Sequence, residues 1–185
     1  MPVFACLLRA VNVGGRNALG MAALTEVCAG LGLEHARTLL QSGNVVFRSG
    51  RQGRAQLAAK LEGAIVDRFA VRPQVLLRSR EELQAALDAN PFAAAARTDP
   101  SHLLIHFFDG KPASGAAGTL AGWDRGPEQA RLVGRNLYLH YGEGMGRSKL
   151  TSAWIEKTLG ASGTARNWNT VTKLAGLCAA LEEGA

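Results

Sequence analysis

Runs of apolar residues and residues at helical spacing divide the chain into short elements. Residues 3–8 are apolar at every position, a pattern typical of a central strand that is covered on both faces. Residues 21–31 and 51–69 carry apolar side chains at helical spacing, which predicts two amphipathic helices. A further apolar run at 73–77 predicts another strand.

A hairpin is expected between the two helices. Residues 36–40 and 45–47 are strand-like and flank Gln-Ser-Gly-Asn at 41–44, a sequence typical of a tight turn. Residues 1–79 therefore follow the order βαββαβ, the split-βαβ or ferredoxin-like unit. In this topology the loop at 12–17, after the first strand, lies beside the 41–44 turn at one edge of the sheet.

The second part of the chain follows a similar order. Its expected elements are a helix at 81–90, a strand at 102–108, a weak helix or loop at 112–120, hairpin strands at 129–133 and 137–141, and helices at 149–159 and 168–181. We therefore predict an α+β fold of two ferredoxin-like halves, βαββαβ followed by a linker helix and βαββαα. The expected boundaries are 1–79 for the first half, 80–100 for the linker helix and its connection, and 101–185 for the second half with its C-terminal helix.

Charge is distributed unevenly along the chain, whose net charge is +6. Residues 1–80 carry eleven Lys or Arg and four Asp or Glu, whereas residues 81–185 carry ten and eleven. The positive excess favours an anionic partner for the first half. The alternative is that these arginines form an ordinary solvated surface. With 47% hydrophobic and 19% charged residues, the composition is that of a globular rather than a disordered protein.

The cysteines and apolar runs indicate where the protein resides. Cys6, Cys28 and Cys178 lie far apart in apolar runs, which predicts buried thiols in a reduced protein and no disulfide framework. No apolar run is long enough to cross a bilayer, and no signal peptide precedes the first strand. We therefore expect a cytoplasmic protein without a membrane partner.

Five motifs stand out along the chain. They are LLRAVNVGG at 7–15, TLLQSGNVVF at 38–47, NPF at 90–92, GRSKL at 146–150 and TARNWNTVTKL at 164–174. Together they resemble a bacterial family of unknown function, DUF1697, across nearly the whole chain and in the family's order. This chain has Ala10 where the family usually has Gly, and Ala165 where it often has Thr, which removes one hydroxyl. The resemblance implies a cytosolic α+β protein built on ferredoxin-like units and leaves its activity open.

The polar residues of these motifs include no carboxylate. Guanidinium groups, side-chain amides and glycine N–H groups bind phosphate or carboxylate oxygens and suit general base catalysis poorly. The alternative is that Asn and Gly serve turn geometry and that the arginines cap carbonyls. The predicted ligand-binding residues are Arg9, Asn12, Gly14, Gly15, Arg16, Asn17, Gln41, Ser42, Asn44, Ser148, Lys149, Arg166, Asn167, Trp168 and Asn169.

The 142–149 segment follows an expected strand and opens an expected helix, a context in which backbone N–H groups hold phosphate. It is not a Walker A loop, because Tyr141 stands where the first Gly is required and Arg147 where Lys is required. Two roles fit this segment, an anion site at the helix N-terminus and a plain N-cap at Ser148, and we predict the N-cap. In the last motif, Trp168 either stacks on a base or anchors the last helix to the core.

Histidine positions give only a weak indication of metal binding. His102 and His106 share a face of one expected strand, and His140 belongs to the next hairpin. A metal ion would need a third ligand and access to solvent. The chain contains no GxSxG, HExxH or dinucleotide-binding glycine motif. We expect no metal and no cofactor, and we assign no catalytic residue.

Three functions fit this set of residues. The leading hypothesis is binding of a nucleotide, a phosphate-bearing metabolite or a nucleic acid at the rim formed by the 12–17 loop and the 41–44 turn, joined by 166–169. The second is an enzyme that acts by positioning and electrostatics, such as a transferase, with Lys149 or Arg166 stabilising developing charge. The third is a scaffold in which the motifs support the interface of two half-domains or a homodimer.

Overall fold

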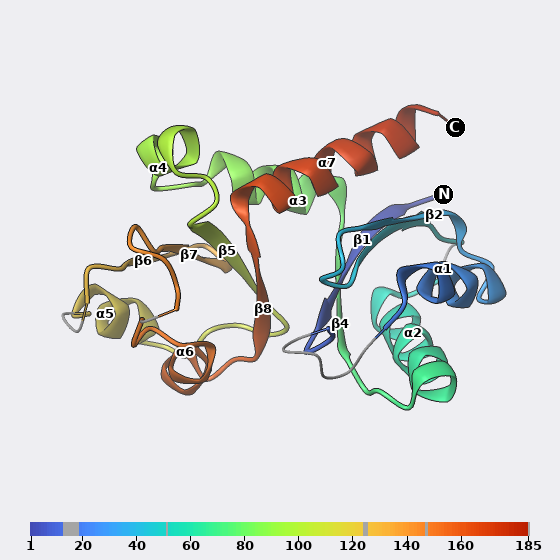
Figure 1. The fold of residues 1–185 in the computed structure, drawn as a ribbon, viewed down its shortest axis with the longest axis horizontal. Coiled ribbons are helices and arrows are strands. Elements are labelled where there is room, and N and C mark those ends of the chain that lie inside the picture. Colours follow the sequence, from blue (N-terminus) through green and yellow to red (C-terminus); the bar gives the residue numbers. More distant parts are fainter. Residues whose placement is uncertain (13–18, 51, 124–125, 147, 185) are drawn as a thin grey trace. The chain divides into compact units, whose positions relative to one another are not determined.

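The chain forms two compact units in the computed structural model, which describes residues 1–12, 19–50, 52–123, 126–146 and 148–184 (Figure 1). The first unit comprises Met1–Leu83 and Lys173–Ala185, and the second comprises Gln84–Thr172. Both are mixed α+β with a four-stranded antiparallel sheet, which confirms the expected class. No described helix combines the length and the hydropathy of a membrane span.

The first unit has the element order expected from the sequence. Its elements are β1 (Val3–Arg9), α1 (Met21–Gly30), β2 (Glu34–Leu39), β3 (Asn44–Arg48), α2 (Arg54–Phe69) and β4 (Gln74–Arg78). The strand order is β2-β3-β1-β4, with every neighbouring pair antiparallel. Strand β1 is therefore central, as its unbroken apolar run predicts.

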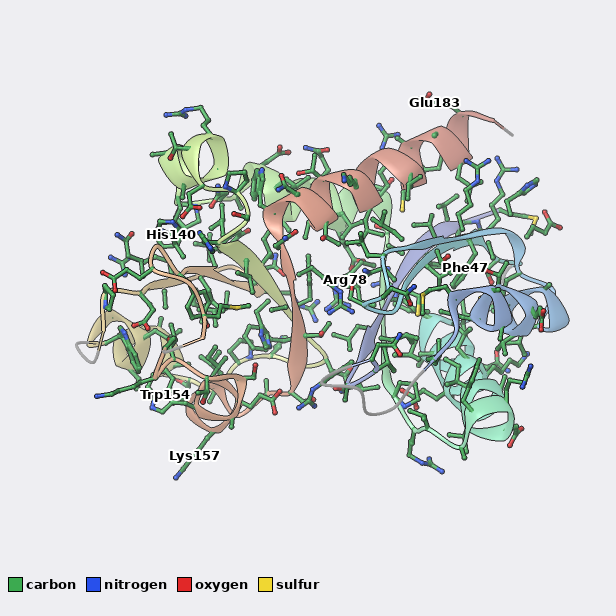
Figure 2. The ribbon with its side chains drawn as sticks, in the orientation of Figure 1. Phe47, Arg78, His140, Trp154, Lys157 and Glu183 are labelled. Carbon is green, nitrogen blue, oxygen red and sulfur yellow. The ribbon has the colours of Figure 1, made fainter. Side chains whose placement is uncertain are left out.

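The core of the first unit lies between one face of the sheet and helices α1 and α2. Strand β1 contributes Phe4, Cys6 and Leu8 to this core, and Phe47 joins them from β3 with none of its surface exposed (Figure 2). The alternate β1 residues are buried as well, so the strand is covered on both faces. All three cysteines are buried thiols that form no disulfide, as expected. Burial raises the pKa of Cys28 to about 12, which keeps that thiol protonated.

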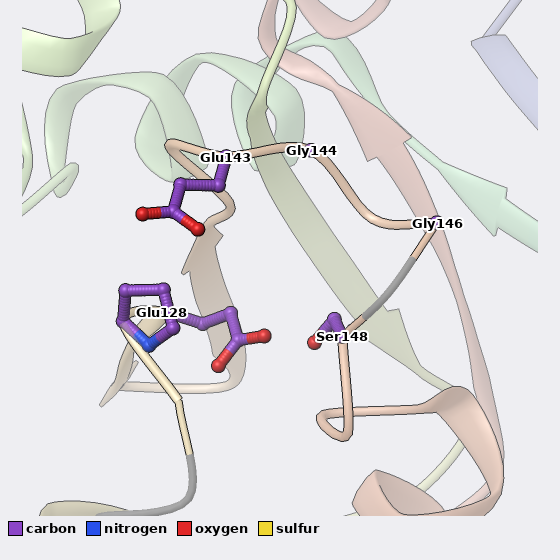
Figure 3. Close-up of a pocket in the computed structure, with 6 residues that line it drawn as sticks. Glu128, Glu143, Gly144, Gly146 and Ser148 are labelled. Atoms are coloured by element: carbon purple, nitrogen blue, oxygen red, sulfur yellow. The ribbon is translucent and has the colours of Figure 1, made fainter.

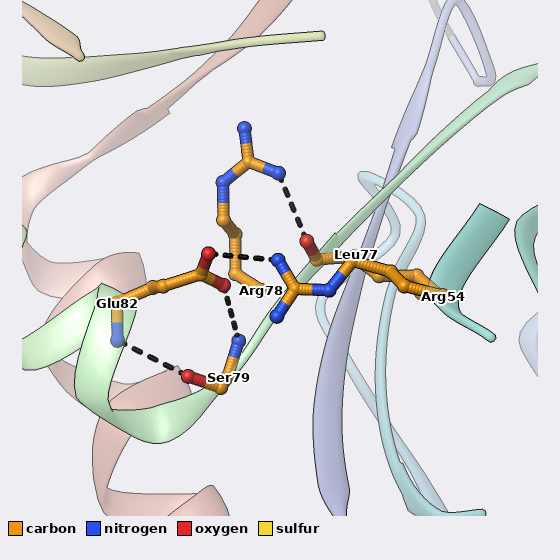
Figure 4. Close-up of polar contacts among 5 residues, drawn as sticks. All are labelled: Arg54, Leu77, Arg78, Ser79 and Glu82. Atoms are coloured by element: carbon orange, nitrogen blue, oxygen red, sulfur yellow. Dashed lines mark hydrogen bonds and ion pairs between the residues drawn. The ribbon is translucent and has the colours of Figure 1, made fainter. Parts of the chain in front are cut away.

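Helix α3 (Arg80–Asp88) begins with a capping box formed by Ser79 and Glu82 (Figure 4). The Glu82 carboxylate accepts a hydrogen bond from the backbone N–H of Ser79 at 2.8 Å, and the Ser79 hydroxyl accepts one from the backbone N–H of Glu82 at 3.3 Å. Arg54, the first residue of α2, forms an ion pair of 2.7 Å with the same carboxylate. This carboxylate therefore joins the starts of two helices within the first unit.

Helix α7 (Trp168–Glu183) contributes its C-terminal part to the first unit, whereas the sequence assigned all of 101–185 to the second half. The Arg48 guanidinium donates a hydrogen bond to the carbonyl of Leu181. Arg80 and Glu182 form an ion pair of 3.1 Å. These contacts, made by residues more than a hundred positions apart, explain why 173–185 group with the first unit.

The second unit contains one strand more than expected. Its elements are α4 (Ala93–Thr98), β5 (Leu103–Phe108), α5 (Ala116–Ala121), β6 (Gln129–Val133), β7 (Asn136–His140), α6 (Ser152–Leu159) and β8 (Gly163–Asn167), and its strand order is β6-β7-β5-β8. The predicted order βαββαα is therefore wrong at β8, which stands between α6 and α7. The sequence predicted only a connection between the last two helices, whereas the structure has a strand there.

Strand β8 was not predicted because its sequence, GTARN, lacks the alternation of apolar and polar residues that is typical of a strand. It forms through antiparallel pairing with β5, which sets Arg166 opposite Ile105 and Gly163 opposite Phe108. A Cβ atom at Gly163 would lie 2.3 Å from the carbonyl oxygen of Phe107, so only glycine allows this approach of the two backbones.

Candidate functional site

Asn12 closes the connection between β1 and α1. Its side-chain amide donates a 3.0 Å hydrogen bond to the carbonyl of Leu19, and its amide oxygen accepts one of 2.7 Å from the backbone N–H of Leu19. The same amide group also donates a 2.7 Å hydrogen bond to the carbonyl of Gln41. The two ends of the connection therefore meet at Asn12, next to the turn between β2 and β3.

We call the hydrogen bonds of Asn12 to Leu19 and Gln41 the Asn12 clamp. Several of the predicted ligand-binding residues lie in the sequence between Asn12 and Leu19. Gly14, Gly15, Arg16 and Asn17 all lie in the stretch from 13 to 18, outside the described residues. Asn12 itself adopts a φ of +52°, a left-handed conformation that asparagine tolerates better than most residues. Its side chain serves the loop's geometry, so we assign it a positioning role.

The 41–44 turn is also built around an asparagine. Asn44 is fully buried, and its amide donates hydrogen bonds to the carbonyl of Leu39 at 3.0 Å and to the hydroxyl of Ser42 at 2.9 Å. Gly43 has a φ of +71°, and a Cβ atom there would lie 2.4 Å from Cγ2 of Val11. The turn is thus packed tightly against the start of the β1–α1 connection, while Gln41 and Ser42 are exposed.

Arg9 ends β1 on the same side of the sheet as the Asn12 clamp. Its guanidinium donates a 3.3 Å hydrogen bond to the side-chain oxygen of Gln74, with which it also pairs in the β1–β4 ladder. Arg9 is half-buried. The structure therefore gathers Arg9, Asn12, Gln41, Ser42 and Asn44 within the first unit.

The predicted residues from the last motif belong to the second unit, at the junction of β8 and α7. Arg166 is buried and donates hydrogen bonds to the hydroxyl of Thr164 at 2.7 Å and to the carbonyl of Ala165 at 2.9 Å. The Asn167 side chain accepts a 2.9 Å hydrogen bond from the backbone N–H of Thr170, as a helix cap does. The local contacts of both side chains are structural.

Trp168 and Asn169 open helix α7. Trp168 is half-buried, and its carbonyl accepts a 3.0 Å hydrogen bond from the hydroxyl of Thr172. Asn169 is exposed. Of the predicted residues in this segment, Asn169 therefore has the side chain with the most access to solvent.

Ser148 is not the N-cap of helix α6, contrary to the sequence prediction. The helix begins at Ser152, and the Thr151 hydroxyl caps it by accepting a 3.2 Å hydrogen bond from the backbone N–H of Trp154. The Ser148 hydroxyl instead accepts a 2.9 Å hydrogen bond from the backbone N–H of Leu150. The helix starts later because the chain at 148–150 makes a local turn.

A pocket of about 340 Å³ lies beside Ser148, and the charged groups among its described lining residues are acidic (Figure 3). Glu128 and Glu143 point their carboxylates into it, and Gly144, Gly146 and Pro127 complete its lining. A hydrogen bond from Ser148 is the main cause that lowers the pKa of Glu128, so this carboxylate is ionised at neutral pH. Two carboxylates oppose binding of an anion here, which separates Ser148 from the basic residues of the first unit.

Three of the four histidines divide into a half-buried pair and a fully buried one. Asp99 accepts hydrogen bonds from Nδ1 of His102 at 2.7 Å and from Nε2 of His140 at 2.9 Å, one on each carboxylate oxygen. His106 is buried in β5, against the ring of Phe108. Among the described residues no group of three or more His, Cys, Asp or Glu has the geometry of a metal site.

Sequence reasoning missed Asp99, Glu128 and Glu143. Glu143 lies inside the glycine-rich 142–149 segment, and its negative charge was a signal against an anion that the prediction did not use. Glu128 and Asp99 lie outside every motif, and only the fold brings them to Ser148 and to the two histidines. No periodicity or spacing marks such pairs in advance.

Comparison with known proteins supports the fold and names no activity. The family described as "Protein of unknown function (DUF1697)" matches residues 1–138. No curated protein matches the chain. Among solved structures, the chain is similar to the conserved bacterial protein SP0830 from Streptococcus pneumoniae, with 25% sequence identity and a TM-score of 0.72. That similarity covers 96% of this chain and 98% of the other.

Proposed function

The chain belongs to the DUF1697 family, whose description assigns no activity, and we propose that this member binds an anionic ligand at the β1–α1 connection. The ligand is a nucleotide, a phosphate-bearing metabolite or a nucleic acid. Its site comprises the 12–17 loop and the 41–44 turn of the first unit. The residues with direct roles are Arg9, Gly14, Gly15, Arg16, Asn17, Gln41 and Ser42.

The observation that carries this proposal is the Asn12 clamp. The Asn12 side chain makes three hydrogen bonds of 2.7 to 3.0 Å: two to backbone groups of Leu19, which close the connection, and one to the carbonyl of Gln41, which joins it to the turn. Fixing the two ends of a loop lowers the conformational entropy that is lost when a ligand binds to it. The clamp therefore supports a binding role for the loop that it closes.

Charge supports an anion rather than a cation or a neutral ligand. The first acidic residue in the chain is Glu26, so every charged side chain of β1 and of its connection to α1 is positive. Arg9 and Arg16 supply two of these charges, and Gly14 and Gly15 allow backbone N–H groups to approach a phosphate closely. Guanidinium groups and backbone amides are the usual donors to phosphate oxygens.

A second candidate function is a scaffold, and the buried asparagines favour it. Asn44 has no exposed surface. The side-chain amides of Asn44 and Asn12 both donate their hydrogen bonds to other residues of the chain. In that function the motif stabilises the fold or a homodimer and binds nothing. The experiment must therefore separate loss of a ligand from loss of stability.

A thermal-shift titration of the full chain tests the proposal. The probes are inorganic phosphate, ATP and a single-stranded oligonucleotide, each at two salt concentrations. We expect at least one probe to raise the melting temperature, and we expect Arg16→Gln and Arg9→Gln to weaken its binding by about tenfold each, since each removes a charge-assisted hydrogen bond. Arg72→Gln, an exposed cation of the same unit, is the matched control.

The outcomes discriminate between the candidates. Binding that Arg16→Gln weakens while Arg72→Gln does not supports the anion site, and a steep salt dependence identifies nucleic acid as its ligand. If no probe binds and Asn12→Ala lowers the melting temperature by many degrees, the scaffold is the correct function. Turnover of a probe during the titration would favour an enzyme of the transferase type.

We also propose the finer description of the fold and of the cell compartment. The strand orders in the two sheets are β2-β3-β1-β4 and β6-β7-β5-β8. Along the chain, each unit has one helix between its first and second strands and one between its third and fourth strands. Both features support two ferredoxin-like units. Buried, protonated thiols support a bacterial protein of the reducing cytoplasm. A disulfide-trapping assay under oxidising conditions, with the folded chain, tests whether the thiols stay unreactive.

A further inference from the structure

A second cavity of the second unit combines an apolar floor with two cations. It has a volume of about 290 Å³ and lies between the segment that leads into α5 and the turn that joins β6 to β7. The residues that line it are Lys111, Pro112, Ala113, Gly115, Ala117, Leu132, Gly134 and Arg135. None of these residues belongs to a motif that the sequence singled out.

The floor of the cavity is apolar and anchored to the core of the unit. Ala113 is held by a 2.6 Å hydrogen bond from its backbone N–H to the carbonyl of Leu159, and Leu132 packs against the buried core cluster. Gly115 and Gly134 have φ angles of +86° and +59°, and a Cβ atom at either would meet nothing within 4 Å. The cavity therefore has a fixed base and an unobstructed mouth.

The two charged residues of the lining are both basic. Lys111 and Arg135 are exposed, and no carboxylate of the described residues lines the cavity. Within the described part of the chain, no ion pair joins either of them to an acidic side chain. Their charges are thus available to an anion at the mouth of the cavity.

We propose that this cavity binds a small organic anion with one carboxylate and a compact apolar body. The carboxylate pairs with Lys111 and Arg135, and the apolar body rests on Pro112, Ala117 and Leu132. The volume lies near the lower end of ligand pockets, roughly 300 Å³, which limits the ligand to about the size of benzoate. This inference is independent of the site proposed in the first unit.

The acidic pocket of the same unit provides an internal contrast. Glu128 and Glu143 line that pocket, so an anion that enters the Lys111–Arg135 cavity should avoid it. Charge, rather than size, distinguishes the two cavities, because their volumes of about 290 and 340 Å³ are similar. A cavity that bound its ligand by apolar contact alone would bind an anion and its neutral analogue equally well.

The test is a titration of the ¹⁵N-labelled full chain with benzoate and, separately, with benzyl alcohol, followed by NMR. We expect saturable shifts of the Gly115 and Gly134 amides with benzoate, and binding of benzyl alcohol that is about tenfold weaker. The double variant Lys111→Gln/Arg135→Gln should weaken benzoate binding by about tenfold. The control, Arg97→Gln/Lys157→Gln, removes two exposed cations of the same unit that do not line the cavity and should leave binding within about twofold.

Ala117→Trp, which places a large side chain in the cavity, should abolish the benzoate shifts in a chain whose spectrum remains dispersed. Equal binding of benzyl alcohol, unchanged binding in the Lys111→Gln/Arg135→Gln variant, shifts confined to the Glu128 pocket, or no saturable shift at all would each overturn the proposal. Arg16→Gln should not alter benzoate binding, so failure here and failure of the first-unit site are distinguishable.

Discussion

Asn12 and Gln41 are 29 residues apart in sequence, yet the side-chain amide of Asn12 donates a 2.7 Å hydrogen bond to the backbone carbonyl of Gln41. The same side chain exchanges hydrogen bonds with both backbone groups of Leu19. One asparagine thus fixes the ends of a loop and joins that loop to a neighbouring turn.

Replacing Asn12 by Ala should lower the free energy of unfolding by about 2–3 kcal/mol, because three hydrogen bonds are lost and the part-buried backbone groups of Leu19 lose their partner. Urea denaturation measures the change. Gln41→Ala is the matched control, since Gln41 contributes its backbone carbonyl and its side chain is exposed; it should change stability by less than about 0.5 kcal/mol. Equal stability of Asn12→Ala and the wild type would contradict the clamp.

Gly43→Ala should destabilise the first unit by about 2–4 kcal/mol, because its Cβ atom would lie 2.4 Å from Cγ2 of Val11 and 2.9 Å from Cβ of Leu8. Gly32→Ala separates this clash from the backbone cost. Gly32 has the same φ of +71° and nothing within 4 Å of a Cβ atom, so its replacement should cost only about 1 kcal/mol. If chemical denaturation gives equal losses, the packing of Val11 against the turn is not the cause.

Asp99 should make stability sensitive to acid. The hydrogen bond from His140 is the main cause that lowers the pKa of Asp99; partial burial opposes it, and the hydrogen bond from His102 adds to it. Because the folded-state pKa is depressed, the stabilisation is fully present above the unfolded value, about 3.8, and is lost as the pH falls through the folded-state pKa.

An NMR titration of the Asp99 carboxyl carbon measures this effect. His140→Gln should raise the pKa of Asp99 more than His102→Gln does, because the His140 hydrogen bond is the larger cause. Asp99→Asn should flatten the acid limb of the stability profile. An identical acid limb in Asp99→Asn would show that other carboxylates control it.

Asn167→Ala should destabilise the start of helix α7 by about 1 kcal/mol, because the side chain accepts hydrogen bonds from both the backbone N–H and the hydroxyl of Thr170. Asn167→Asp keeps the acceptor and should retain most of the stability. Asn169→Ala, at an exposed neighbour, is the control and should be nearly neutral. Thermal unfolding followed by circular dichroism compares the three variants.

Local patterns in the sequence were sufficient for most of the elements. The apolar run of β1, the helical spacing in α1 and α2, and the turn residues around Gly43 each report a preference that acts over a few residues. Strand β8 carries no such pattern, because its polar sequence becomes a strand only by pairing with β5. The late start of α6 at Ser152 depends likewise on a turn at 148–150 that hydropathy does not reveal.

For the candidate site, the residue types were predictable and their use was not. Arginines, asparagines and glycines without a nearby carboxylate indicated that a ligand of the first unit carries negative charge. The structure then assigned Asn12 and Asn44 to positioning, because their amides bond to backbone groups of Leu19, Gln41 and Leu39. A side chain's partners depend on which segments the fold brings together, and sequence spacing does not record that.

The sequence alone determined the α+β class, the buried cysteines, the central position of β1 and the excess of positive charge in residues 1–80, because hydropathy and charge are properties of each residue in place. Only the tertiary structure decided that Glu128 and Glu143 make one cavity of the second unit acidic, while Lys111 and Arg135 make another basic. The local sign of a surface depends on which charges the fold places within a few ångströms, since solvent and salt screen those that are farther apart.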